Sequence, residues 1–210
     1  CKTFAVTSAK PSEGKSLTAA NIAISYAMLG KRVLLVDADM RKPTQRRLWK
    51  VELSTGLCDY LAKIWQLELA KVTELPLWIV CTGTIPPNPS ELLSSDRMKS
   101  FVESCADYYD YVIIDSPPLG FFSDSELLSD LSDASVLVVR QDTVPAPEIN
   151  DAIDALRAGK AEFLGCILND MSHLTAYSAG YGYGYGYYGY GYGKKYDKYG
   201  YGHHSGRKQQ

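Results

Sequence analysis

The chain has 210 residues, of which 46% are hydrophobic and 22% are charged, enough for one domain with a packed core. Its formal net charge of −2 argues against a dedicated nucleic-acid-binding protein, and we expect no nucleic-acid partner. No apolar run approaches the ~20 residues that a membrane-spanning helix needs.

Short strand-like runs alternate with longer amphipathic segments. In chain order the expected strands are Thr3–Ser8, Arg32–Asp37, Leu77–Thr82, Tyr111–Asp115, Ser135–Arg140 and Phe163–Asn169. The expected helices are Lys15–Leu29, Thr55–Ile64, Ser90–Asp107, Ser123–Leu131 and Pro147–Gly159. Strands that are nearly continuous in Val, Ile and Leu, separated by helices, indicate an α/β fold with a mostly parallel sheet and helices on both faces. Ligands of such sheets bind at the carboxyl ends of the strands.

A phosphate-loop pattern follows the first expected strand. The segment AKPSEGKS, Ala9 to Ser16, matches G-x-x-x-x-G-K-S/T with alanine in the first position, between a strand and a helix. Backbone N–H groups of such a loop bind a polyphosphate, so we expect Lys15 to reach the β- and γ-phosphates of ATP and the Ser16 hydroxyl to bind Mg²⁺. The alternative is an ordinary helix entry capped by Ser12 or Ser16.

The residues predicted to bind ATP are Ala9, Lys10, Pro11, Ser12, Glu13, Gly14, Lys15, Ser16, Leu17 and Asn169. Asn169 ends the last expected strand, where it is expected either to contact the adenine edge or to form a simple turn.

Acidic residues end two further strands. VDADMRKP places Asp37 and Asp39 after the second strand, and YVIIDSPP places Asp115 after the fourth. Carboxylates at these positions are typical partners of the magnesium ion in phosphate-loop enzymes. Each could instead cap a local turn, but together with the loop they indicate one ATP and Mg²⁺ site. The expected metal-binding residues are Ser16, Asp37 and Asp115.

The end of the chain has a different composition. The α/β pattern covers residues 1–171, and residues 172–210 form a low-complexity segment in which tyrosine and glycine alternate. Glycine at every second position favours a mobile chain, so we expect one folded domain followed by a disordered tail. From Tyr177 onward the tail carries five basic residues and one acidic residue, which gives +4 and leaves about −6 on the rest.

Three segments, TSAKPSEGKSLTAANIA, VLLVDADMRKPT and YYDYVIIDSPP, closely resemble the bacterial tyrosine kinases of capsule and exopolysaccharide systems. The resemblance runs over residues 2–171, and the tyrosine-rich tail extends it. It implies a P-loop NTPase-like fold and an ATP- and Mg²⁺-dependent protein tyrosine kinase. By this resemblance Asp37 helps to hold the metal, Asp39 orients or deprotonates the acceptor hydroxyl, and Asp115 is the Walker B aspartate. With Lys15 these are the expected catalytic residues.

The resemblance also implies a role for the tail, because members of the family phosphorylate their own C-terminal tyrosine cluster. The predicted acceptors are Tyr181, Tyr183, Tyr185, Tyr187, Tyr188, Tyr190, Tyr192, Tyr196, Tyr199 and Tyr201, with Tyr177 as a further candidate. A competing interpretation is an adhesive Gly/Tyr tract that stacks on sugars, nucleic acid or itself.

Partners are implied by the same resemblance. They are a membrane-bound polysaccharide co-polymerase that acts as activator (or a missing N-terminal membrane half), further copies of the chain, and a phosphotyrosine phosphatase. The expected location is cytoplasmic, at the inner face of the cell membrane. The chain begins with Cys1 rather than methionine, so we expect upstream sequence to be missing. The family's upstream E-x-x-R-x-x-R segment, which contacts the neighbouring subunit in a ring, is not found before Lys2, which implies either a truncated chain or a different assembly.

The alternative function is that of a deviant Walker A ATPase, a nucleotide-dependent positioning switch without tyrosine kinase activity. Lys10 favours it, because related division-site ATPases carry a signature lysine at this loop position. Pro11 and Glu13 are unlike the glycine-rich loop of that group, and a solvated Lys10 is the other interpretation. Arg41 and Lys42 are expected either to steady phosphates or to face solvent.

Overall fold

The computed structural model describes residues 1–120 and 123–171. The predicted tail, residues 172–210, lies outside the described residues together with all of its candidate acceptor tyrosines. The domain boundary at residue 171 therefore stays a prediction.

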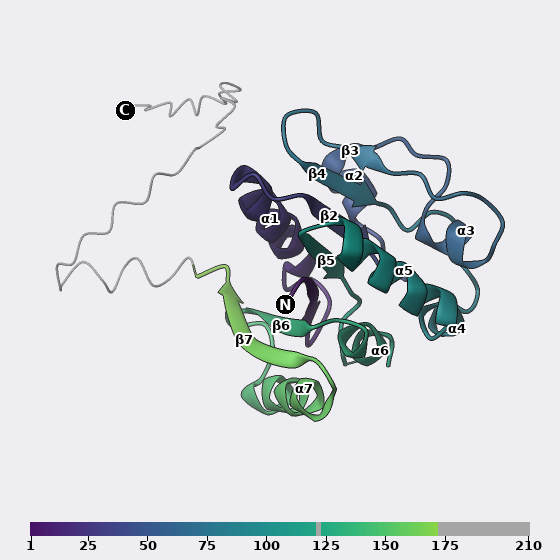
Figure 1. Cartoon of the computed structure of the whole chain (residues 1–210). Helices are drawn as coiled ribbons and strands as arrows, with labels where there is room; N and C mark the ends of the chain where they lie inside the picture. Colours follow the sequence, from purple (N-terminus) through teal and green to yellow (C-terminus); the bar gives the residue numbers. More distant parts are fainter. Residues whose placement is uncertain (121–122, 172–210) are drawn as a thin grey trace, which may run out of the picture. The chain divides into compact units, whose positions relative to one another are not determined.

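In the described residues the strands form one seven-stranded sheet with the order β3-β4-β2-β5-β1-β6-β7 (Figure 1). The strands are β1 (Thr3–Ser8), β2 (Val33–Asp37), β3 (Ala70–Lys71), β4 (Leu77–Val80), β5 (Tyr111–Asp115), β6 (Ala134–Arg140) and β7 (Glu162–Asn169). Neighbouring strands pair in parallel, except that the short β3 is antiparallel to β4. The predicted mostly parallel α/β fold is confirmed.

Helices cover both faces of this sheet. They are α1 (Lys15–Met28), α2 (Gln45–Trp49), α3 (Leu57–Leu61), α4 (Pro89–Leu93), α5 (Asp96–Tyr108), α6 (Asp124–Asp130) and α7 (Ala146–Ala158). Successive residues of a strand point to opposite faces. Val33 and Leu35 accordingly pack with α1, whereas Leu34 and Val36 pack with the cluster that contains α3 and α5. The central strands β1, β2 and β5 are thus buried on both sides, which explains their nearly unbroken apolar sequence.

The packing of α1 places the phosphate loop. Its inner face is formed by Ala19, Ala20, Ala23 and Ala27, all buried, and these small side chains allow the helix to lie close to the sheet. The helix begins directly after Gly14, whose φ of 90° is left-handed and favours glycine. The loop is therefore held between a central strand and a tightly packed helix.

Two predicted helices differ from those observed. The segment expected as one helix, Ser90–Asp107, is divided into α4 and α5, because the Ser95 hydroxyl accepts a hydrogen bond from the Met98 N–H at 3.2 Å and caps a new helix. The helix expected from Thr55 starts only after Gly56, which packs against the backbone of Cys81 and Gly83.

The sequence did not indicate α2 or β3. Both are too short, at five and two residues, to display a period in their side chains.

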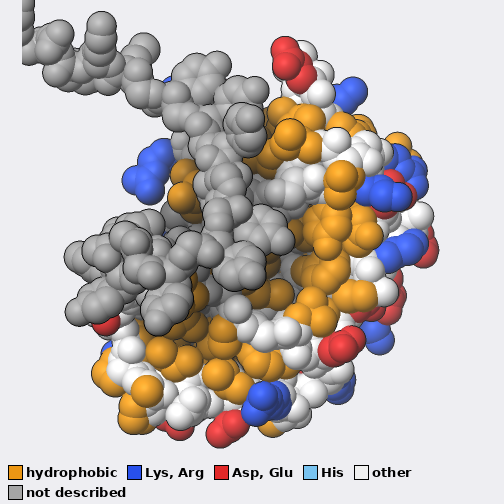
Figure 2. All heavy atoms as spheres, turned by 90° about the vertical axis from the view of Figure 1, so that its left-hand side faces the viewer, with side chains coloured by type: hydrophobic (Ala, Val, Ile, Leu, Met, Phe, Trp, Pro, Cys, Tyr) orange, Lys and Arg blue, Asp and Glu red, His pale blue; other side chains and the backbone are white. Residues whose placement is uncertain are grey.

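Apolar side chains are exposed beside the open edge of the sheet. Leu164 of β7 and Met28 and Leu29 at the end of α1 and just beyond it are at least half exposed. A groove of about 590 Å³ lies between α1 and β7. Figure 2 views the molecule from the side on which α1 and β7 lie in Figure 1, and hydrophobic side chains are visible at its surface. Among the described residues, no helix combines the length and the apolar character needed to cross a bilayer.

Candidate active site

A pocket of about 510 Å³ opens at the carboxyl ends of β1, β2 and β5, which are neighbours in the sheet. Six of the residues that line it belong to the predicted ATP-binding set: Pro11, Ser12, Gly14, Lys15, Ser16 and Leu17. The other lining residues are Asp39, Arg41, Lys42, Thr44, Arg47, Leu48, Pro117 and Pro118. The three motifs, far apart in sequence, therefore meet at one edge of the sheet.

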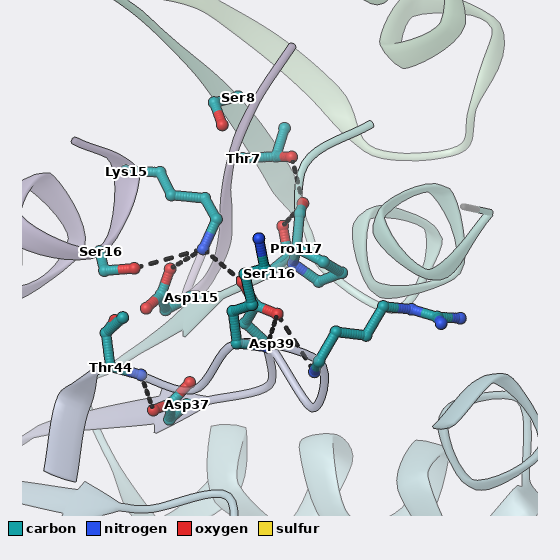
Figure 3. A network of polar contacts seen from close by, with 12 residues as sticks. Thr7, Ser8, Lys15, Ser16, Asp37, Asp39, Thr44, Asp115, Ser116 and Pro117 are labelled. Carbon is teal, nitrogen blue, oxygen red and sulfur yellow. Dashed lines mark hydrogen bonds and ion pairs between the residues drawn. The ribbon is translucent and has the colours of Figure 1, made fainter. Parts of the chain in front are cut away.

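Lys15 is the centre of this site and is only 7% exposed. Its ammonium donates to Asp39 Oδ2 at 2.8 Å, to Asp115 Oδ1 at 3.3 Å and to Ser16 Oγ at 3.2 Å (Figure 3). Burial lowers the pKa of Lys15, but the carboxylates of Asp115 and Asp39 outweigh burial and raise the pKa above its ordinary value. Lys15 is therefore a buried cation paired with two carboxylates.

Asp37 ends β2 directly opposite Asp115 at the end of β5. Its Oδ2 accepts hydrogen bonds from the backbone N–H groups of Thr44 and Gln45, at 3.0 and 2.9 Å. Its Oδ1 is buried without a hydrogen-bond partner among the described residues. Burial, followed by the charge of Asp115, raises the pKa of Asp37 to about 7.

Asp115 is fully buried, and both of its oxygens are used. Oδ1 pairs with Lys15, and Oδ2 accepts from the Gln45 amide at 2.8 Å. Burial raises the pKa of Asp115, while Lys15, Gln45 and Ser16 act to lower it.

Asp39 is fixed by the turn that follows β2. Its Oδ1 accepts from the backbone N–H groups of Arg41 and Lys42, at 3.3 and 2.9 Å, which leaves Oδ2 for Lys15. Because Asp39 also lines the pocket, it is the carboxylate that a group entering the pocket would meet beside Lys15.

The unpartnered oxygen of Asp37 fits a hard cation. Among the described residues no three His, Cys, Asp or Glu side chains converge well enough to hold a metal by themselves. Mg²⁺ commonly uses one or two carboxylates together with substrate phosphates and water. Ser16, Asp37 and Asp115 are therefore the residues that could hold Mg²⁺, with a nucleotide completing its coordination.

Four predicted ATP-binding residues do not line the pocket. Ala9 is buried, and Lys10 forms a salt bridge with Glu148 of α7 at 2.5 Å. Glu13 is fully buried and braces the loop from within, since its carboxylate accepts from the backbone N–H of Lys10 at 2.7 Å. The Asn169 amide donates to the Glu13 carbonyl at 2.9 Å, so it supports the loop from β7. Their contacts with a nucleotide stay predictions.

The sequence did not decide whether Arg41 contacts phosphates or faces solvent, and it did not indicate the partners of Arg41. Arg41 Nε donates to the buried carboxylate of Asp124 at 2.8 Å, and the Ser90 hydroxyl donates to the same carboxylate at 2.5 Å. This anchor holds Arg41 at the wall of the pocket. Asp124 and Ser90 belong to helices α6 and α4, and no motif links them to the site.

Gln45 was also missed. It is the first residue of α2, and its amide contacts both the phosphate loop and Asp115. A single glutamine in a five-residue helix gives no signal in sequence.

Comparisons with known proteins identify a family for this arrangement. The AAA domain family matches residues 1–146. The tyrosine-protein kinase YwqD of Bacillus subtilis (strain 168) is 43% identical over 171 residues, covering 80% of this chain and 72% of YwqD. The solved kinase domain of the Escherichia coli tyrosine kinase ETK is 32% identical to this chain and superposes on it with a TM-score of 0.78, covering 89% of this chain and 72% of that one.

A more distant likeness concerns the fold alone. The septum site-determining protein MinD of Pyrococcus horikoshii, solved with Mg-ADP, is 20% identical with a TM-score of 0.69, covering 80% of this chain and 69% of that one. It matches the predicted P-loop NTPase-like architecture. The positioning ATPase is not favoured, because the higher identities belong to tyrosine kinases and because Lys10 is paired with Glu148 of the same chain.

Proposed function

The chain is an AAA-domain protein of the bacterial tyrosine-protein kinase family, and we propose that it transfers the γ-phosphate of ATP to tyrosine hydroxyls of its own C-terminal tail. The observation that carries this proposal is that Lys15, which lines the pocket together with Asp39, contacts the carboxylates of both Asp39 and Asp115. A phosphate-binding lysine, a carboxylate for the acceptor and carboxylates for Mg²⁺ are the parts that phosphoryl transfer requires.

The ion pairs of Lys15 with Asp39 and Asp115 suggest a separate role for each carboxylate of the site. Lys15 neutralises Asp39 while phosphates are absent, and phosphate oxygens compete for the same ammonium. When Lys15 turns to the phosphates, Asp39 Oδ2 becomes free to accept the proton of an incoming hydroxyl. Asp37 and Ser16 would hold Mg²⁺ on the phosphates, and Asp115 would support it from the outer sphere. Mg²⁺ neutralises the charge that develops on the transferred group.

The acceptor is a tyrosine of the tail, Tyr181 to Tyr201. A tyrosine hydroxyl has a pKa near 10 and stays protonated at neutral pH, so it needs a carboxylate beside the reacting phosphate. A flexible segment of about 30 residues has a root-mean-square reach of roughly 30 Å. Glycine spacers would therefore let many hydroxyls reach one site, on the same copy or on a neighbour.

The biological role that we propose is control of capsule or exopolysaccharide synthesis and export. The kinase would act at the inner face of the membrane, bound to a membrane-anchored activator that completes its active state. It would form homo-oligomers, and a phosphotyrosine phosphatase would reset the tail. These proposals rest on the resemblance stated for the sequence.

Labelling with ATP tests the proposal. We expect the full chain, incubated with Mg²⁺ and labelled ATP, to gain phosphate on tail peptides mapped by mass spectrometry. Lys15→Met should abolish the label, because the phosphates lose their ammonium partner. It also leaves Asp39 and Asp115 unpaired, so its folding must be checked by circular dichroism.

A tail variant is the matched control. Replacing the ten tail tyrosines from Tyr181 to Tyr201 by phenylalanine leaves the pocket intact and should remove the label without changing nucleotide binding. Equal labelling of a folded Lys15→Met variant would overturn the proposal.

A further inference from the structure

One buried glutamine links the three parts of the site. Gln45 has no exposed surface, and its Nε2 donates to Asp115 Oδ2 at 2.8 Å and to the Ser16 carbonyl at 2.9 Å. Its backbone N–H donates to Asp37 Oδ2 at 2.9 Å. A single residue of α2 is thus bonded to the phosphate loop, to the end of β2 and to the end of β5.

Trp49 fixes the orientation of the Gln45 amide. The indole Nε1–H of Trp49, one turn further along α2, donates to Gln45 Oε1 at 3.0 Å. An indole nitrogen can only donate, so the amide oxygen must face Trp49 and the amide nitrogen must face Asp115 and Ser16. The side chain is therefore held with both amide hydrogens directed at the site.

No other residue of similar size supplies these contacts. Methionine fills nearly the same volume but has no donor, so the fully buried Asp115 carboxylate would lose the hydrogen bond that the Gln45 amide donates to its Oδ2. Glutamate would place a third carboxylate beside Asp37 and Asp115. The amide is the group that holds a buried carboxylate in place without adding charge.

We propose that Gln45 is a positioning residue for the magnesium–nucleotide complex. It sets the direction of the Asp115 carboxylate and the position of the loop at Ser16. Its amide oxygen, bonded to the Trp49 indole, links this arrangement to α2. The inference rests on the proposed function, since it concerns the site assigned there to Mg²⁺ and ATP.

The first test is the magnesium dependence of ADP binding by the full chain, measured by isothermal titration calorimetry with Mg²⁺ or with EDTA. We expect Gln45→Met to weaken Mg-ADP binding about tenfold, as the loss of one hydrogen bond to a charged group implies. Binding in EDTA should change less than about threefold, since the loop's backbone N–H groups remain. A variant that only lost stability would weaken ADP binding by the same factor in Mg²⁺ and in EDTA.

Val102→Ala is the matched control. Val102 is a buried core residue of α5, a helix that contributes no residue to the pocket. This variant should lose stability yet keep the parent's ratio of ADP affinity with and without Mg²⁺.

The second test uses Trp49 as a reporter. The chain has three tryptophans. Replacing Trp65 and Trp78 by phenylalanine leaves only Trp49, whose emission should change when Mg-ADP binds. Adding Gln45→Met should abolish that change at saturating Mg-ADP, because the bond between the indole and the site is gone.

Each outcome decides a different point. Failure of the parent chain to bind Mg-ADP would overturn the proposed function, and this inference with it. Binding by the parent together with an unchanged magnesium dependence in Gln45→Met would overturn the inference alone. Should Gln45→Met fail to fold, Trp49→Phe replaces it in the calorimetry. This variant removes the hydrogen bond that orients the Gln45 amide, so the ratio of ADP affinity with and without Mg²⁺ should fall about threefold. An unchanged ratio would overturn the inference.

Discussion

Asp37 shows how a single residue serves the site at a cost to the fold. Its carboxyl is fully buried next to Asp115, and one oxygen has no partner among the described residues. A buried, partly unsatisfied carboxylate destabilises the folded state. The arrangement makes physical sense when a cation supplies the missing partner.

We therefore expect Asp37→Asn to stabilise the nucleotide-free protein. A folded-state pKa of about 7, against an ordinary value of 3.8, contributes stability that is fully present below 3.8 and is lost as the pH rises through 7. Asparagine does not ionise, so at pH 8 in EDTA its free energy of unfolding should exceed the parent's by on the order of 2 kcal/mol. The difference, measured by urea unfolding, should shrink as the pH falls from 8 toward 4.

Asp110→Asn is the control for this experiment. Asp110 is only partly buried, and its hydrogen bonds from Arg32 lower the pKa of its carboxyl. It should not stabilise the protein at pH 8. A parent that is as stable as Asp37→Asn at pH 8 would show that Asp37 carries no such penalty.

At the scale of elements, the start of α3 depends on a close backbone contact. Gly83 follows β4 with a φ of +80° and lies against Gly56, the residue that precedes α3. The carboxylate of Asp59 accepts from the N–H groups of Gly56 and Thr84, at 2.9 and 3.1 Å, and closes this contact. A Cβ on Gly83 would collide with both Asp59 and Gly56.

Gly83→Ala is expected to destabilise the protein by about 3 kcal/mol, which combines left-handed backbone strain with the collision. Gly30→Ala is a matched variant, because Gly30 has a similar φ of +77° but nothing within 4 Å of its Cβ position. It should cost only about 1 kcal/mol. Denaturant unfolding measures both, and equal losses would mean that the contact with α3 adds nothing to stability.

At the scale of the whole molecule, the described core is complete without the tail. All three clusters of buried apolar residues are formed by residues between 4 and 163. The tail carries a net charge of +4, and each phosphate would add about −1.5 to −2, so three phosphates would reverse its sign. The tail is thus expected to act through its charge and its hydroxyls rather than through the fold.

A chain ending at Met171 should therefore keep the denaturant midpoint and the Mg-ADP affinity of the full chain while forming no phosphotyrosine. Mixed with the full-length Lys15→Met variant, it should phosphorylate the tail of that variant if transfer occurs between copies. A marked loss of stability on truncation would contradict the view that the core is self-contained.

From the amino-acid order alone we could predict the phosphate loop, the two acidic strand ends and the mostly parallel sheet. These features depend on local order: AKPSEGKS between a strand and a helix, and aspartates directly after buried strands. They could be read because parallel strands bring their carboxyl ends to one edge whatever lies between them. The split of Ser90–Asp107 into two helices was visible in principle as a serine cap, but its apolar pattern continues across the break.

Which side chains turn toward the pocket depends on how distant elements pack, and this could not be predicted from the sequence. Glu13 and Lys10 belong to the loop motif, yet one is buried within the loop and the other pairs with α7. Gln45 and Asp124 carry no motif, yet they hold Asp115 and Arg41 in place. Their contacts join residues 70 and 83 positions apart, and the direction of a side chain across such a distance is set by the packing of whole elements.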